Sequence, residues 1–242
     1  MTTAQGPQRA DGWTTAVRQR LGLGRLLPLG GSADGAWIAE TAAASVLRGA
    51  AARPGTVLGK LRIGPTEEAV AGSGPDGAQA PGDQAPPTPP SGLPPVPLRI
   101  QAEFSATPDR PLPDTAAALR AALLTAAATR LGLEIAEVDL TVTALLEDGA
   151  PDQVTEPETT VARVAEPEGP VAAAVAGTPG VVSLTRVLGS PVHTDRDHVR
   201  VEVATAGDHR ALDVARSVRT AVAAATEARL PVSVLVTEVV SR

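Results

Sequence analysis

The chain of 242 residues has no cysteine and no tyrosine. Without cysteine it can form no disulfide, no thiolate nucleophile and no cysteine-based metal site. One phenylalanine and two tryptophans are present, so the core must be built mainly from alanine, valine and leucine. Small side chains of this kind require close packing of helices and strands in place of aromatic bulk.

Lysine is also scarce, because Lys60 is the only one and arginine carries the rest of the positive charge. The formal net charge is −6, which argues against a general nucleic-acid binder. The bias toward alanine, glycine, proline and arginine is typical of a high-GC, actinobacterial-type genome.

Long apolar runs are missing as well. No stretch approaches the roughly 18 apolar residues that a membrane-spanning helix needs, and the polar first twelve residues lack the apolar centre of a secretory signal. We therefore expect a cytoplasmic protein without a transmembrane segment, whose contact with the membrane is peripheral at the inner face or made through a partner.

The stretch from Val96 to Leu146 is the best-defined part of the chain. Apolar and polar residues alternate at 98–104 and again at 138–144, which predicts two half-buried strands. Between them an alanine-rich segment has apolar residues at helical spacing, with Asp114 as a candidate cap and Gly132 after its end. The order is strand, helix, strand.

The stretch from His198 to Val240 repeats this plan. Valines alternate at 199–203 and at 232–236, and a helix with the buried stripe Leu212, Ala215, Val218 and Val222 lies between them, with Asp208 as its candidate cap. Each stretch is preceded by a helix, a Pro-Gly turn and a further strand. The first of these helices is predicted to open at Asp34.

A strand–helix–strand unit is almost always a parallel crossover, and the two earlier strands of each half should pair as an antiparallel hairpin. We therefore predict an α+β fold of two tandem αββαβ units, each a small mixed three-stranded sheet with two helices on one face. The uncovered faces would carry Arg99, Gln101, Glu103, Thr141 and Thr143 in one unit and Arg200, Glu202, Ser233, Leu235 and Thr237 in the other.

The predicted organisation has four parts. Residues 1–33 are an N-terminal arm, 34–146 the first domain, 147–168 an acidic linker, and 169–242 the second domain. The first domain contains an insert at 64–97 with ten prolines and no lysine or arginine, which favours a solvated polyproline-like loop. The insert could be a ligand for a proline-recognising domain or a passive loop, and we favour the passive loop.

The N-terminal arm is the one candidate binding segment. It combines apolar and basic residues at partly helical spacing: Trp13, Val17, Arg18, Arg20, Leu21 and Arg25. One interpretation is an amphipathic helix that docks on a membrane surface or a partner. The alternative is a short helix that packs on the first domain, and we favour this alternative.

The order of helix, Pro-Gly turn, two strands, helix and strand resembles the alkaline shock / general-stress envelope protein family. The resemblance rests on Pro54-Gly55-Thr56-Val57, on Pro179-Gly180-Val181 and on the valine-rich last strands at 138–142 and 232–236. It implies a non-enzymatic, self-associating protein at the cytoplasmic face of the membrane, recruited by a membrane protein. The tandem duplication, the proline-rich insert and the arm depart from the family pattern.

Residues that could support chemistry are few. His193, Asp195, Asp197 and His198 are metal-ligand types but lack the usual ligand spacing, so we interpret them as a polar hairpin turn. No phosphate loop or nucleophile elbow is present. We therefore predict no catalytic residues, cofactor or metal site, and an envelope-stress scaffold or interaction protein that does not bind nucleic acid. A nucleic-acid-binding module and an enzyme with an unrecognised site are the alternatives.

Overall fold

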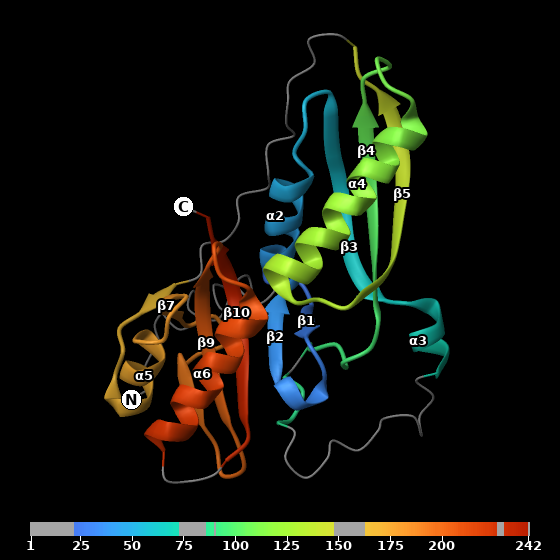
Figure 1. Cartoon of the computed structure of the whole chain (residues 1–242). Coiled ribbons are helices and arrows are strands. Elements are labelled where there is room, and N and C mark those ends of the chain that lie inside the picture. The colour runs from blue at the N-terminus through green and yellow to red at the C-terminus, as the bar shows by residue number, and fades with distance from the viewer. Residues whose placement is uncertain (1–21, 73–85, 90, 148–162, 227–229, 242) are drawn as a thin grey trace, which may run out of the picture.

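The computed structural model describes residues 22–72, 86–89, 91–147, 163–226 and 230–241. These residues form helices and strands around two mixed β-sheets, which we name sheet A and sheet B (Figure 1). The predicted α+β class is confirmed.

Sheet B has the strand order β3-β4-β5, formed by Thr56–Pro65, Leu98–Ala106 and Ile135–Leu145. As predicted, β3 runs antiparallel to β4 and β4 runs parallel to β5. The register of the β3–β4 pair shifts between Leu58 and Leu61, which places a β-bulge around Gly59. Two helices, α2 (Glu40–Ala51) and α4 (Leu112–Ala126), pack against this sheet and each other (Figure 1).

Sheet A has seven strands, not the three predicted for a unit. Its centre follows the prediction, because β7 (Val181–Thr185) is antiparallel and β10 (Val232–Val240) parallel to β9 (Val199–Ala206). The short strands β6 (Val164–Ala165) and β8 (Val192–Thr194) pair with β7 and β9. Helices α5 (Gly169–Ala176) and α6 (Ala211–Ala225) cover one face of this sheet (Figure 1).

The other two strands of sheet A come from the beginning of the chain. Strand β1 (Leu26–Leu29) and strand β2 (Ala36–Ala39) form a hairpin, and β2 pairs in parallel with β10. The predicted start of the first helix at Asp34 is therefore wrong. Asp34 ends a 3₁₀ turn, and the helix, α2, begins at Glu40. All eight residues of the two strands are buried, since pairing with β10 overrides local helix preference.

The proline-rich insert and the acidic linker are more structured than predicted. Strand β3 extends to Pro65 and a short helix, α3 (Glu67–Gly72), follows it. Ser91 and Leu93 hydrogen-bond to Leu26 through the backbone, so the end of the insert is tied to sheet A. Strand β6 likewise lies within the span predicted as the acidic linker.

The predicted caps differ from the observed ones. Asp114 lies in the first turn of α4, and α6 begins three residues after Asp208, at Ala211. Gly132 has a left-handed φ of 91° after a π-helical turn at Ala127–Leu131, so its role as the terminating glycine is confirmed. A Cβ at this position would come within 2.5 Å of the Leu212 Cβ, so the glycine also lets the two halves approach closely.

The core is one cluster that runs through both sheets. The predicted helix stripes are confirmed at their centres, because Leu119 and Leu123 in α4 and Leu212, Ala215, Val218 and Val222 in α6 are buried. Phe104, the only phenylalanine, lies fully buried among aliphatic side chains. Alanines complete the packing, as the composition predicts.

Candidate functional site

The face of sheet B opposite its helices is polar and accessible. Gln101, Thr141 and Thr143 are exposed there, and Arg99 and Glu103 are half-buried. These are the five residues predicted for the uncovered face of the first half, and the prediction is confirmed. The strand register adds Arg62 beside Gln101 on β3, and Glu137 and Asp139 beside Arg99 and Gln101 on β5.

The equivalent face of sheet A is buried, so the prediction for the second half is wrong. Glu202, Ser233, Leu235 and Thr237 are each at most 5% exposed, and Arg200 is half-buried. The carboxylate of Glu202 accepts hydrogen bonds from the backbone N–H groups of Val187 and Leu188.

Trp37 lies on the same face of sheet A, beside Leu235, and donates a hydrogen bond from Nε1 to the carbonyl of Leu93. The segment after β7 and the end of the proline-rich insert therefore both contact this face. Because the equivalent face of sheet B stays open, sheet B offers the more accessible binding surface.

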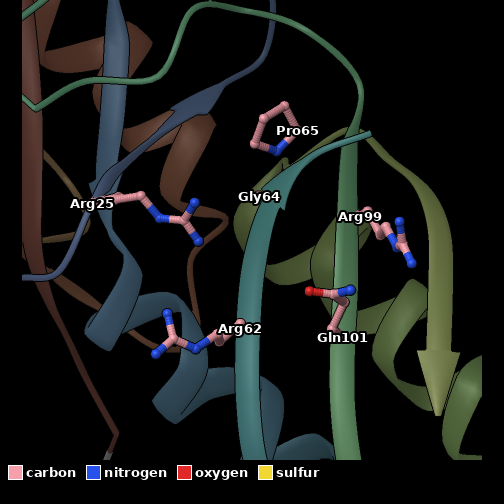
Figure 2. Close-up of a pocket in the computed structure, with 6 residues that line it drawn as sticks. All are labelled: Arg25, Arg62, Gly64, Pro65, Arg99 and Gln101. Atoms are coloured by element: carbon pink, nitrogen blue, oxygen red, sulfur yellow. The ribbon is translucent and has the colours of Figure 1, made fainter. Parts of the chain in front are cut away.

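A pocket of about 250 Å³ lies at the end of the open face. It is lined by Arg25, Arg62, Gly64, Pro65, Arg99 and Gln101 (Figure 2). The volume is below the roughly 300–1,000 Å³ of pockets for drug-sized ligands. Its lining offers guanidinium and amide donors without a nucleophile or a general base, which suits binding rather than bond-making chemistry.

Arg25 is held at the pocket by Glu40, the first residue of α2. Arg25 donates from Nε and Nη2 to the carboxylate at 3.3 Å, and from Nη2 to the carbonyl of Ile63 at 2.6 Å. Burial alone would raise the pKa of Glu40, but the hydrogen bonds from Arg25 and from the Ile63 N–H hold it below its ordinary value. Glu40 thereby joins β1, α2 and β3.

Arg99 turns toward β5, away from Arg25 and Arg62 (Figure 2). It donates to Asp139 and to Glu67, and Glu137 lies 3.7 Å from its Nε. These bonds, first those to Glu67 and Asp139, raise the pKa of Arg99 above its ordinary value. Three carboxylates therefore already neutralise this arginine.

Arg62 differs from the other two arginines of the pocket. It is exposed on β3, and no hydrogen bond or ion pair joins it to any residue in the described ranges. Its guanidinium lies on the same side of β3 as that of Arg25 (Figure 2). The pocket therefore has one cation available for a negatively charged group.

The structure describes the predicted arm only from residue 22 onward. Trp13, Val17, Arg18, Arg20 and Leu21 lie outside the described residues. Arg25 is described, but its guanidinium is bonded to Glu40 and Ile63, and the residues that follow it form a buried strand. Arg25 therefore belongs neither to a helix that docks on a membrane or partner nor to the favoured short helix packed on the first domain. It lies in a bend before β1, and the pairing of β1 with β2 draws this segment into the fold.

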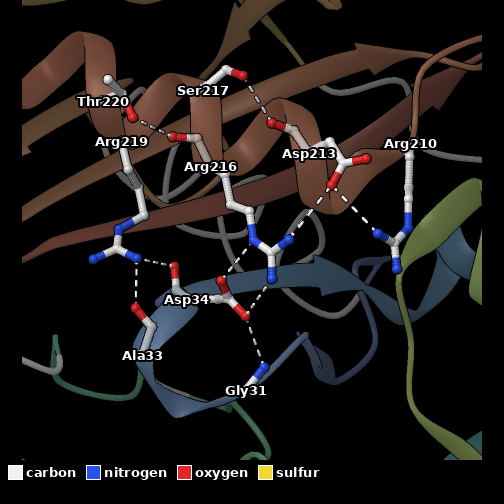
Figure 3. Close-up of polar contacts among 9 residues, drawn as sticks. All are labelled: Gly31, Ala33, Asp34, Arg210, Asp213, Arg216, Ser217, Arg219 and Thr220. Carbon is white, nitrogen blue, oxygen red and sulfur yellow. Dashed lines mark hydrogen bonds and ion pairs between the residues drawn. The ribbon is translucent and has the colours of Figure 1, made fainter.

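A second polar cluster fastens the β1–β2 turn to α6 (Figure 3). Arg216 donates to both carboxylate oxygens of Asp34 at 2.8 and 3.2 Å, and Arg219 donates to the carbonyls of Ala33 and Asp34. The bond from Arg216 lowers the pKa of Asp34 despite partial burial, and Asp34 in turn raises the pKa of Arg216. Burial lowers the pKa of Arg219. This cluster stabilises the junction between the β1–β2 turn and α6.

The candidate metal residues lie in the β8–β9 turn. Ligand atoms of Asp195, Asp197 and His198 lie within 4.8 Å of one another, whereas His193 pairs with Arg200 inside the strand ladder. His198 Nδ1 lies 2.9 Å from Asp197, and this hydrogen bond lowers the pKa of Asp197. Both aspartates are exposed, so the arrangement has the form of a solvated polar turn.

Sequence reasoning missed Arg62 as a functional candidate, although its signal was present. In the strand segment Thr56–Pro65, Leu61 and Ile63 are apolar and buried, so alternation places Arg62 on the opposite face. What the alternation could not show is that Arg25, far away in sequence, lies beside it.

No family model matches the chain, and no curated protein or solved structure matches it either. Among the described residues, no helix is both long enough and apolar enough to cross a membrane.

Proposed function

We propose that this protein is a non-enzymatic interaction protein that binds a protein partner on the open face of sheet B. The observation that carries the proposal is the contrast between the two sheets: the equivalent face of sheet A is buried, whereas that of sheet B is polar and accessible. An accessible sheet face flanked by a donor-lined pocket is a surface on which a partner can be positioned.

The charges around the pocket indicate which kind of side chain the partner places there. Glu40 neutralises Arg25 and three carboxylates neutralise Arg99, while Arg62 has no acidic partner in the described ranges. An acidic side chain of the partner can therefore pair with Arg62, and the Gln101 amide lies next to it in the strand register. The small volume suits one such side chain.

The broader assignment is a scaffold of the alkaline shock type, formed by two tandem αββαβ units. It is supported by the shared order of pairings: an antiparallel pair, then a parallel pair joined by a helix, occurs in β3-β4-β5 and in β7-β9-β10. Following the resemblance, we propose that the protein acts in the cytoplasm at the inner face of the membrane. A membrane protein would recruit it there.

Two observations favour this function over the alternatives. The open face carries acids as well as bases, and Phe104 points inward. Among the described residues, the face therefore has no surface aromatic on which RNA bases stack. The pocket lining contains no histidine, serine or carboxylate that could serve as a nucleophile or base.

The test is capture of partners by full-length protein from the cells that produce it, quantified by mass spectrometry. Arg62→Glu reverses the charge of the available cation, so we expect it to lose about tenfold or more of a specific membrane-protein partner. Arg62→Lys should retain part of the binding, because lysine keeps the positive charge but cannot donate two parallel hydrogen bonds to a carboxylate as a guanidinium does.

Arg110→Glu is the matched control. Arg110 is exposed in the loop after β4, at the opposite end of that strand from the pocket, and the charge change is the same. If Arg62→Glu captures the same proteins as the wild type, or if the captured set is RNA-associated, the proposed function is wrong.

A further inference from the structure

The two edges of sheet B are closed to different degrees. At β3, the backbone N–H of Ile63 donates to Glu40 and its carbonyl accepts from Arg25, so side chains occupy this edge. At β5, nine of the eleven residues pair with β4 along one side, and no other described strand pairs with them. Arg120 reaches the outer edge of β5 at the carbonyl of Val138. An unpaired edge of this length is a template for a further strand.

Strand β5 also exposes apolar side chains. Val142 is 41% and Leu145 60% exposed, although alternation places Val142 on the same side of the strand as the buried Val138. Leu140, between them, is half-buried. A monomer therefore leaves the second half of this apolar stripe in water.

We propose that β5 pairs antiparallel with β5 of a second copy of this chain, with Leu140 opposite Leu140 on the two-fold axis. In this register Val142 lies opposite Val138 of the second copy, and Leu145 opposite Ile135, so the exposed apolar residues gain apolar neighbours. Such a contact is isologous, because each pair occurs twice. It concerns the edge of sheet B and stands independently of the partner proposed for its face.

Charge supports this register. Its polar pairs place Asp139 opposite Thr141 and Glu137 opposite Thr143, so no two carboxylates face each other. A shift that centres the pairing on Asp139 would place this carboxylate opposite its own copy, which is unfavourable. The register centred on Leu140 therefore places each acidic side chain opposite a neutral one.

The backbone also permits the pairing. Nε of Arg120, from α4, donates to the carbonyl of Val138 at 3.2 Å, which places this carbonyl at the side of β5 away from β4. Residues two apart direct their backbone groups to the same side, so Leu140 and Val142 share that edge with Val138. A carbonyl oxygen has two lone pairs and can accept a second donor beside Arg120.

Pairing about the two-fold axis would join the two three-stranded sheets into a single sheet of six strands. Because this axis is perpendicular to the sheet, the helices of both copies would lie on one side and both open faces on the other. The dimer would therefore present two copies of the Arg62 pocket on one surface, which gives a partner two attachment points.

The test is the dimerisation constant of the full-length protein, measured by sedimentation equilibrium for a pair of opposite variants at one position. Thr141→Lys places a cation opposite Asp139 twice per dimer and should lower the dissociation constant roughly fivefold to twentyfold. Thr141→Glu places a carboxylate there and should raise it by a similar factor. High salt should reduce both differences.

Thr125→Lys and Thr125→Glu are matched controls on the exposed side of α4 and should leave the constant unchanged. Circular dichroism checks that all variants remain folded. A protein that stays monomeric up to millimolar concentration, or a Thr141→Lys variant weakened as much as Thr141→Glu, would overturn the proposal. Arg62→Glu should leave dimerisation unchanged, so a failed partner interaction and a failed dimer can be told apart.

Discussion

Strands β4 and β9 have nearly the same pattern but lie in different surroundings. Each alternates apolar residues with an arginine and then a polar or acidic residue: Arg99 and Gln101 in β4, Arg200 and Glu202 in β9. Gln101 is exposed, whereas Glu202 is completely buried. Alternation therefore shows that a strand has two chemically different faces, but it does not show which of them meets water.

The difference arises from segments remote in sequence. Glu202 can be buried because two backbone N–H groups and Arg200, 3.6 Å away, compensate its charge. At sheet B the acids are satisfied within the face, by Arg99, and nothing in the described chain covers them. Three sets of substitutions test this comparison.

The inner faces of the two sheets should respond alike to truncation, and this is the largest expected effect. Leu123→Ala in α4 should cost about 3 kcal/mol of unfolding free energy, and Val222→Ala in α6 somewhat less, because each leaves a cavity among alanines that cannot fill it. Urea denaturation monitored by circular dichroism measures both. Leu124→Ala, at a neighbouring exposed site, is the control, and equal midpoints for Leu123→Ala and Leu124→Ala would contradict the observed packing.

The outer faces should respond differently. Glu202→Ala removes the acceptor of two backbone N–H groups, one of them buried, and the partner of Arg200, so it should cost about 2 kcal/mol. Gln101→Ala, at the corresponding exposed site of β4, should change stability by less than about 0.5 kcal/mol. Thermal unfolding of the two variants compares the faces directly, and similar losses would mean that both faces are equally covered.

The smallest effect concerns the junction between the β1–β2 turn and α6. The pKa of Asp34 is lowered from 3.8 in the folded protein, so its stabilisation is present above pH 3.8 and is lost as the pH falls through the folded value. Asp34→Asn keeps an acceptor for the Gly31 N–H but removes the charge that pairs with Arg216. It should cost about 1 kcal/mol at neutral pH.

The pH dependence distinguishes this ion pair from a purely structural effect. The difference in unfolding free energy between wild type and Asp34→Asn should stay constant from neutral pH to about pH 5 and shrink below pH 4. Chemical denaturation across this range measures it. A difference that persists unchanged at pH 2 would show that the carboxylate charge contributes nothing.

The sequence by itself determined the elements whose partners are close in the chain. Apolar residues recur at the period of a strand in β4, β5, β9 and β10, and at the period of a helix around Leu123 and Val218. These local patterns predict the elements and their buried sides, and the structure follows them. Connection length also determined the pairings, because a helix between two strands requires a parallel crossover and a loop permits a hairpin.

The tertiary structure alone decided what depends on distant contacts. Ala36–Ala39 has residues that suit a helix, yet β10, almost two hundred residues later, makes it a strand. The pairing of β1 with β2 in turn made Arg25, a candidate surface residue in the sequence, a partner of Glu40, and it brought Arg25 beside Arg62. Local propensity is worth only tenths of a kcal/mol per residue, whereas burial against a sheet contributes whole kcal/mol per side chain, so distant packing prevails.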